Sequence, residues 1–325
     1  MNTKLKMPLV TMINGVTISC PNPIEFKDFL IEIFNWKLFK KGKISKKIET
    51  HWGIDFGSAG EEWYILYSPK SNRGMIRIVK GINRERTRPL TTRWSGIEIV
   101  VMSGIDELFR KITKNSSFET LSSPTTYDFS DVGANIHRAF HGKGPGKTHL
   151  MFTMEVTKPT AGYDFPSAHS QVGHIFSVPL VTKKYNESLS FYKNEIGMIP
   201  VLTDHLVESL WHKTWKIPDE SPVDISILKG DAPGFGLGGI ELQGYDNNFV
   251  DPIKPKDNLF DGGICLTTYT SNQIDLLHEI IKKSSFAKNI SDLTHLDESP
   301  YGSNKAFCFQ GPSGEKVEVI EKNWS

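Results

Sequence analysis

The sequence predicts an α+β fold built from one unit that occurs four times: a strand, an amphipathic helix and three further strands. Two observations support this prediction. A strand-to-helix pattern recurs in the second and fourth units, and the helices of the first and third units end in the same way. A chain of 325 residues, 38% hydrophobic and 23% charged, is long and apolar enough for two globular domains of ordinary size.

The recurring strand-to-helix pattern marks the start of the second and fourth units. Residues 96–101 (GIEIVV) are typical of a strand and precede the helical pattern of residues 105–109 (IDELF). Residues 263–268 (GICLTT) and 274–277 (IDLL) repeat this order. Self-similarity on this scale predicts a repeated structural unit.

The first and third units share a helix end. Residues 29–36 (FLIEIFNW) parallel residues 191–198 (FYKNEIGM), which places Asn35 opposite Gly197. Both residue types tolerate the left-handed conformation that follows the last turn of a helix. We therefore expect four βαβββ modules, at about 10–82, 93–157, 171–246 and 260–322.

The best candidate for a domain boundary is a stretch rich in Pro and Gly without periodicity, residues 157–166 (TKPTAGYDFP). This boundary predicts that the modules pair in chain order. One domain would cover residues 1–157 and the other residues 171–325, each with two modules.

Composition and charge exclude several classes of protein. The net charge is +1, so no overall field favours nucleic acid or an anionic membrane, and no apolar run is long enough to span a bilayer. Cys20, Cys265 and Cys308 are too widely spaced for a disulfide framework or a zinc ribbon and fit a reducing cytosol. The start of the chain lacks the apolar core of a signal peptide. We expect a cytoplasmic monomer or homodimer that binds a small-molecule substrate.

Three side chains that can bind a metal lie in short apolar strands. They are His174 in GHIFSV (173–178), Glu241 in GIELQ (239–243) and Glu318 in VEV (317–319). Alternate residues of a strand point to opposite faces, so the apolar neighbours of each Glu can pack under a helix while the carboxylate faces the other way. A single such residue often has an ordinary structural explanation, whereas the three together favour a metal site.

These stretches, with the turn at residues 311–314 (GPSG) and the matching helix end, resemble the vicinal oxygen chelate superfamily of glyoxalase I, bleomycin-resistance proteins and type I extradiol dioxygenases. In that family a His opens the first strand of a βαβββ module and a Glu lies in its last strand. The resemblance implies four modules paired into two curved-sheet domains, with His174, Glu241 and Glu318 converging on one concave face. Such a ligand set suits Fe(II), Mn(II), Ni(II), Co(II) or Zn(II) and leaves positions open for substrate oxygens.

The chain departs from the family pattern at several positions. Gly15, Gly96 and Gly263 stand where the other first strands would offer a His, and Arg77 replaces the acidic ligand of the first module. The resemblance therefore implies a metal site in the C-terminal domain and none in the N-terminal domain. Cys308 stands at the place of the Tyr in the dioxygenase signature, which weakens ring cleavage as the reaction.

A polar segment of the third module, residues 204–215 (DHLVESLWHKTW), holds two Trp and two His. One interpretation is a hairpin that packs its own tryptophans, and the other is a wall or lid of the pocket. In the second interpretation His205 or His212 is an acid–base group that titrates near neutral pH. The apolar contacts to the substrate would then come from Trp211, Trp215 and Phe176.

Two weaker signals predict no function of their own. His137, His141 and His149 form a loose cluster whose spacing matches no helical pair of metal ligands, so we expect no second metal site there. Cys265 shares a face with Gly263 but is more typical of a buried small hydrophobe than of a thiolate ligand.

Three functions fit these expectations. The first is a metal-dependent isomerase, epimerase or lyase that chelates two neighbouring oxygens of a small substrate and stabilises an enolate or oxyanion. The second is an Fe(II)-dependent extradiol-type dioxygenase. The third is a metal-free binding or resistance protein on the same scaffold. A fold resemblance does not name the substrate.

Overall fold

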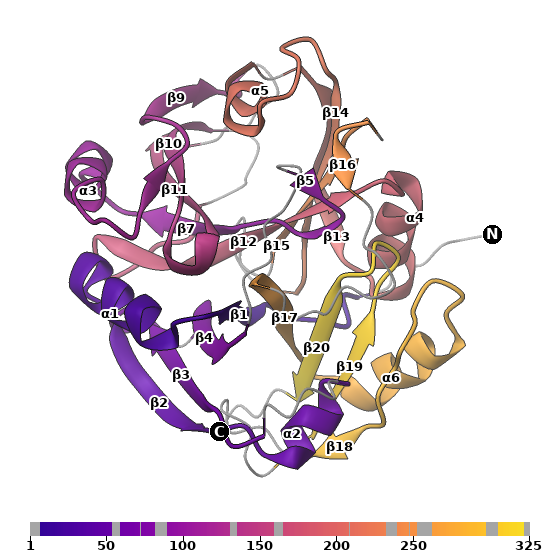
Figure 1. Cartoon of the computed structure of the whole chain (residues 1–325). Helices are drawn as coiled ribbons and strands as arrows, with labels where there is room; N and C mark the ends of the chain where they lie inside the picture. Colours follow the sequence, from indigo (N-terminus) through magenta and orange to yellow (C-terminus); the bar gives the residue numbers. More distant parts are fainter. Residues whose placement is uncertain are drawn as a thin grey trace.

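The computed structural model of the chain contains four modules in the predicted order (Figure 1). It describes residues 7–53, 59–71, 73–81, 90–130, 135–158, 165–207, 209–231, 239–246, 248–251, 262–296 and 305–321. The first module comprises β1 (Ile13–Cys20), α1 (Pro23–Phe34), β2 (Lys37–Lys43), α2 (Lys46–His51), β3 (Glu62–Tyr67) and β4 (Met75–Lys80). The second comprises β7 (Ile97–Val101), α3 (Ile105–Ile112), β8 (Glu119–Thr120), β9 (Thr125–Asp128), β10 (Ile136–Lys143), a 3₁₀ turn (Pro145–Lys147) and β11 (His149–Thr157).

The other two modules follow the same order of elements. The third comprises β12 (Val172–Thr182), α4 (Tyr185–Ser190), a π-helical turn (Phe191–Glu195), β13 (Ile199–Leu206), α5 (Ser209–Trp215), β14 (Val223–Lys229) and β15 (Gly239–Gly244). The fourth comprises β17 (Gly263–Ser271), α6 (Ile274–Lys283), β18 (Thr294–His295), β19 (Lys305–Gln310) and β20 (Lys316–Glu321). Three short strands lie outside the modules: β5 (Leu90–Thr91), β6 (Arg93–Trp94) and β16 (Val250–Asp251).

The modules pair in a different order from the one predicted. An eight-stranded sheet joins the first and fourth modules in the order β18-β19-β20-β17-β1-β4-β3-β2. A ten-stranded sheet joins the third and second in the order β13-β14-β15-β12-β7-β11-β10-β8, and its other two strands are β6, which pairs with β12, and β9, which pairs with β10. The prediction that residues 1–157 and 171–325 form separate two-module domains is therefore wrong. The pairing depends on long-range antiparallel contacts between first strands, β1 with β17 and β7 with β12, which a local repeat does not encode.

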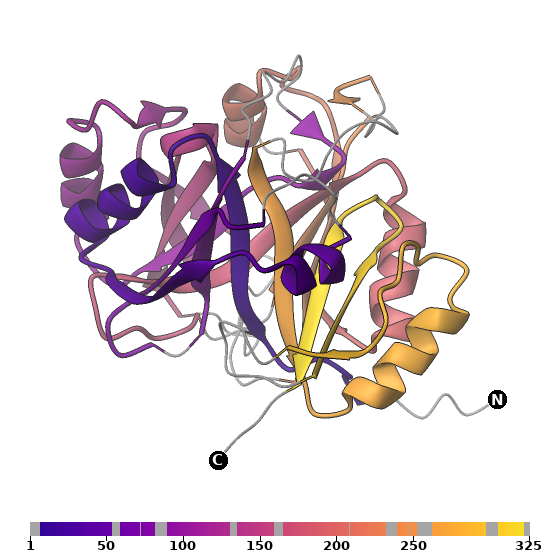
Figure 2. The same ribbon diagram turned by 60° about the horizontal axis from the view of Figure 1, so that its bottom comes forward.

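One hydrophobic core joins the two sheets. Helices α1 and α3 lie at one end of the molecule and α4 and α6 at the other, between the two sheets (Figures 1 and 2). Phe34 of α1 packs edge-on against Phe152 of β11, with ring centroids 5.4 Å apart, so a helix of the first module also covers the second module's sheet. No helix in the described part of the chain is long and apolar enough to cross a membrane.

The strand faces that carry the predicted carboxylates point away from this core. Ile240 and Leu242 of β15 belong to the core, as do Val317 and Val319 of β20. Because side chains alternate along a strand, Glu241 and Glu318 each point to the face of their sheet that lies away from the core. The predicted alternation is confirmed for both strands.

The helix ends that supported the repeat also have the predicted conformation. Asn35 follows α1 with φ of 56°, and Gly197 follows the helical segment of the third module with φ of 80°. Both values lie in the left-handed region that closes a helix. At the start of α1, the side chain of Asn22 accepts a hydrogen bond from the backbone N–H of Glu25 (3.2 Å).

A buried glutamate fixes the turn that leads into β20. Glu315 is fully buried, and its carboxylate accepts hydrogen bonds from the Tyr192 hydroxyl (2.6 Å) and the Ser313 backbone N–H (2.8 Å). Burial raises the pKa of Glu315 to about 7, although these hydrogen bonds oppose the shift. The carboxyl group is therefore protonated in the folded chain at pH values where it is ionised in the unfolded chain.

Glu315→Gln should flatten the pH dependence of stability. Between the unfolded pKa of roughly 4.3 and the folded pKa of about 7, the folded state holds one more proton, so the wild-type protein loses stability as pH rises. The variant lacks this contribution. The unfolding free energy of the wild type should therefore fall relative to that of the variant by up to about 1.4 kcal/mol per pH unit in that window. Urea unfolding of both proteins at pH 5 and pH 8 measures the change. Parallel profiles would contradict a raised pKa at this residue.

Candidate functional site

The structure does not bring the three predicted metal ligands together. His174 lies on β12 and Glu241 on β15, both in the ten-stranded sheet, whereas Glu318 lies on β20 in the eight-stranded sheet. The third and fourth modules were expected to share a site, but each is paired with another module. Each Glu therefore belongs to a different group of side chains.

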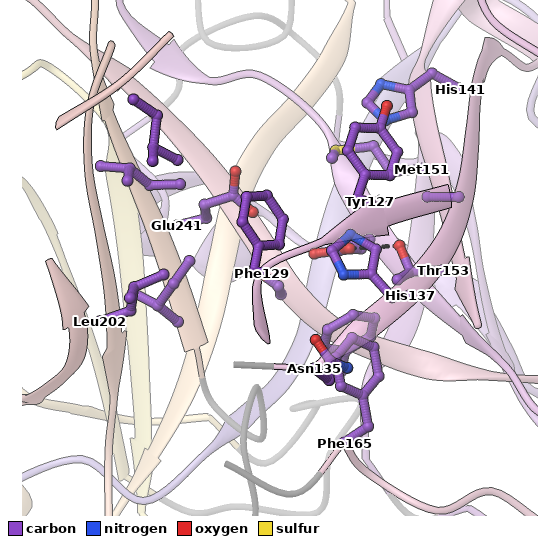
Figure 3. A pocket seen from close by; sticks show the side chains of 17 residues that line it. Tyr127, Phe129, Asn135, His137, His141, Met151, Thr153, Phe165, Leu202 and Glu241 are labelled. Atoms are coloured by element: carbon purple, nitrogen blue, oxygen red, sulfur yellow. Dashed lines mark hydrogen bonds between the residues drawn. The ribbon is translucent and has the colours of Figure 1, made fainter. Parts of the chain in front are cut away.

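Glu241 lies in a pocket on the open face of the ten-stranded sheet (Figure 3). The pocket encloses about 740 Å³ of space, part of it open to solvent, and receives side chains from the second and third modules. Its walls are mainly apolar and include Tyr127, Phe129, Phe165, Phe176, Leu202 and Ile227. An apolar cavity with a few polar groups is typical of a site for a small molecule.

Two buried carboxylates face this pocket. Glu98 of β7 is 8% exposed and Glu241 of β15 is 6% exposed. Glu98 accepts a hydrogen bond from the Thr153 hydroxyl, and Glu241 accepts one from the Gln243 amide. Burial raises the pKa of both groups, and the charge of Glu241 raises that of Glu98 further. Two carboxylates held in an apolar pocket favour either a shared proton or a bound cation.

Four neighbouring strands at the centre of the sheet each present an oxygen-bearing side chain to the pocket. In the order β11, β7, β12 and β15, these residues are Thr153, Glu98, Ser177 and Glu241. Ser177 is the register partner of Glu98, and its buried hydroxyl has no hydrogen-bond partner among the described residues. The strands are the first and last strands of two modules, where the family resemblance places metal ligands.

Two neutral histidines complete the polar part of the pocket. His137 and His141 lie on β10, where alternation turns both toward the cavity. Burial lowers the pKa of each to about 4, so both are uncharged at neutral pH. The His137 ring stacks against both Tyr127 and Phe129, with centroid distances of 5.2 and 5.5 Å.

Sequence reasoning missed Glu98, His137 and His141, although each had a signal. Glu98 follows Gly96 by two residues, so it lies on the strand face where the missing family His was sought. His137 and His141 were tested for helical spacing, but their separation of four residues also places both on one face of a strand. The period-2 pattern was the correct one for this segment.

His174 itself does not line the pocket. It is 3% exposed, and neither ring nitrogen has a hydrogen-bond partner among the described residues. Its β-carbon lies beside Gly74, at the start of β4 in the other sheet. Burial, together with the charge of Arg73, lowers the pKa of His174 to about 4. The register between β12 and β7 shifts on both sides of Ile175, which separates His174 from Ser177, the residue that meets Glu98.

The segment predicted as a lid contributes to the pocket through other residues. Leu202 and Leu206 of β13 line the cavity, whereas His205 lies on the opposite face of that strand and forms a hydrogen bond with the Asp224 carboxylate (2.8 Å). His212 of α5 is buried and donates from Nδ1 to the carbonyl of Asp219 (2.6 Å). Neither of the two histidines lines the pocket.

Of the residues predicted to contact substrate, Phe176 lines the pocket and packs against Phe165 at 5.0 Å. Trp215 does not line the pocket but is buried in an apolar cluster that includes the pocket residues Tyr127 and Ile227, and it packs edge-on against His149 at 4.5 Å. The side chain of Trp211 lies outside the described part of the structure.

The equivalent face of the eight-stranded sheet holds an ion pair. Arg77 of β4 donates to Glu318 of β20 (2.9 Å) and to the Thr17 hydroxyl (2.8 Å), and its guanidinium lies 4.5 Å from the Trp52 ring centroid. Burial alone would raise the pKa of Glu318, but the charge of Arg77 and a hydrogen bond from His51 hold it well below its usual range. Arg77 thus lies at the position where the family resemblance would place the acidic ligand of the first module, as the sequence predicted.

Comparison with known proteins supports the architecture. No family model matches the chain, and no curated protein matches it. Glyoxalase I from Zea mays has a TM-score of 0.60 at 13% identity, covering 95% of this chain and 92% of that chain. A candidate dioxygenase from Bacillus subtilis subsp. subtilis str. 168 has a TM-score of 0.63 at 12% identity, covering 98% and 87%. The chain therefore has the vicinal oxygen chelate fold that the sequence predicted.

Proposed function

We propose that the pocket of the ten-stranded sheet is the active site of a metal-dependent enzyme that acts on a small, largely apolar molecule with two neighbouring oxygen atoms. One observation carries the proposal: four adjacent strands present Thr153, Glu98, Ser177 and Glu241 to a single apolar pocket. The described residues that line this pocket include no Lys or Arg, so no protein cation offsets the two carboxylates.

The donor set fits a hard divalent cation. Glu98 and Glu241 would hold the ion, and the Ser177 hydroxyl, which has no hydrogen-bond partner among the described residues, is available as a further ligand. Oxygen ligands favour Mn(II) or Fe(II) over the softer members of the predicted range, Ni(II) and Zn(II). When bound, the ion would supply Lewis-acid stabilisation of negative charge on the substrate oxygens.

The protein groups have separate tasks in this proposal. Thr153 and Gln243 orient the two carboxylates through their hydrogen bonds. His137 and His141, neutral at physiological pH, are placed to form hydrogen bonds with a substrate held against the aromatic wall. They take the place beside the substrate that the sequence suggested for His205 and His212.

The pocket favours proton-transfer chemistry over ring cleavage. Non-haem Fe(II) oxygenases commonly bind iron with two His and one carboxylate. In this proposal the ion is held by the oxygen donors of the four central strands, and His137 and His141 of β10 face the substrate instead of binding the ion. We therefore place the reaction among the isomerases, epimerases and lyases, with an extradiol-type dioxygenase as the weaker alternative.

Ligand-induced stabilisation tests this function. Small α-hydroxyketones and catechols should raise the melting temperature of the Mn(II)-loaded protein and leave the chelator-treated protein unchanged. A ligand at about 100 times its Kd adds about 2.7 kcal/mol to stability, which is several degrees for a chain of this size. Analogues with a single oxygen serve as controls. Equal shifts with and without metal would identify the pocket as a metal-free binding site.

A further inference from the structure

A second group of metal-competent side chains is buried in the eight-stranded sheet. His51 ends α2, Cys308 lies on β19 and Glu318 on β20, and all three are at most 4% exposed. Their ligand atoms all lie within 4.8 Å of one another. None of these residues lines the pocket of the ten-stranded sheet.

The distances within this group match a coordination site. His51 Nε2 lies 3.2 Å from Glu318 Oε1 and 3.4 Å from Cys308 Sγ. Bond lengths of about 2.0 Å to nitrogen or oxygen and 2.3 Å to sulfur separate the ligand atoms of a tetrahedral Zn(II) by roughly 3.3–3.6 Å. One ring nitrogen carries at most one proton, which cannot bond well to both neighbours, whereas a single cation can bind all three atoms.

The surrounding side chains hold the carboxylate in place for such a site. Arg77 and the Thr268 hydroxyl both donate to Glu318 Oε2, at 2.9 and 2.7 Å, which turns Oε1 toward His51. Cys308 and Glu318 are register partners on neighbouring strands, so their side chains emerge side by side. Hydrogen bonds of this kind around a metal orient its ligands and strengthen binding.

The ligand types set this group apart from the pocket. A thiolate is a soft donor and an imidazole a borderline one, and this pair suits Zn(II) or Co(II), whereas the described lining of the pocket contains no Cys. All three ligands are buried, and the Trp52 indole N–H donates to Glu318 Oε1 (3.0 Å), the oxygen that faces His51.

We propose that His51, Cys308 and Glu318 form a buried Zn(II) site that ties α2 of the first module to β19 and β20 of the fourth. We assign the site a structural role, since all three ligands are buried. The proposal is independent of the reaction assigned to the pocket, because the two groups share no residue.

Cobalt incorporation tests the site on the full chain. Protein expressed in Co(II) medium should contain one thiolate-bound Co(II) per chain and absorb in the near ultraviolet through sulfur-to-cobalt charge transfer. Cys308→Ser should lose this band and one equivalent of metal. Cys265→Ser is the matched control, since this buried thiol donates to the Thr17 carbonyl instead, and it should keep both. Glu98→Gln should also keep the band.

The result with the wild-type protein decides the proposal even if Cys308→Ser fails to fold. If the wild-type protein grown in cobalt medium is folded but shows no charge-transfer band, the proposed metal site is wrong. His51, Cys308 and Glu318 would then be an ion pair with a neighbouring thiol. A band that persists in folded Cys308→Ser would overturn it equally, because the sulfur ligand would then be another cysteine.

Discussion

Replacing either pocket carboxylate with its amide, Glu98→Gln or Glu241→Gln, should weaken Mn(II) binding by at least about 100-fold. Each change removes one of two charged ligands, and changes to the groups that only orient metal ligands already cost 10- to 100-fold. The amides keep nearly the same shape, so the fold should persist. Calorimetric titration of chelator-treated protein with Mn(II) gives the affinities.

Two comparisons give this prediction its specificity. Glu61→Gln alters a surface glutamate paired with Lys80 and should leave the Mn(II) affinity unchanged. Thr153→Val removes the hydrogen bond to Glu98 and should have an intermediate effect, about 10- to 100-fold. If both pocket amide variants bind Mn(II) as tightly as the wild type, the ion is not held by these carboxylates.

Arg77→Met should cost about 3–5 kcal/mol of folding stability. The change removes the guanidinium that pairs with the buried Glu318 carboxylate and contacts the Trp52 ring, and it leaves a buried charge with less compensation. A Met side chain fills much of the same space, so the loss reports the charge more than the volume. Urea unfolding at constant pH measures it.

Arg138→Met provides the matched control for that measurement. Arg138 also pairs with a carboxylate, that of Asp106 (2.7 Å), but the pair is at the surface and should contribute about 0–1 kcal/mol. Equal losses in the two variants would mean that the ion pair of the eight-stranded sheet has no special role in its stability.

The local features of the fold were predictable because short-range chemistry fixes them. Asn35 and Gly197 close helices in the conformation that their residue types allow, and the strand alternation around Glu241 and Glu318 places both carboxylates away from the core. These features depend on neighbours in sequence. The four-module architecture followed from them once the repeat was recognised.

The composition of the site was harder to predict because it depends on which modules become neighbours. β7 and β12 meet at the centre of one sheet, so Glu98 of the second module joins Glu241 of the third. The same rearrangement separates Glu318 from Glu241 and places it beside His51, a residue at the end of a helix in the first module. A single sequence carries no direct record of such long-range pairing.

The most direct test of the account is anomalous diffraction from crystals grown with Mn(II). The account predicts a peak in the pocket of the ten-stranded sheet, within bonding distance of the carboxylates of both Glu98 and Glu241. Well-ordered crystals with an empty pocket, or with Mn(II) only at sites that involve neither residue, would contradict it.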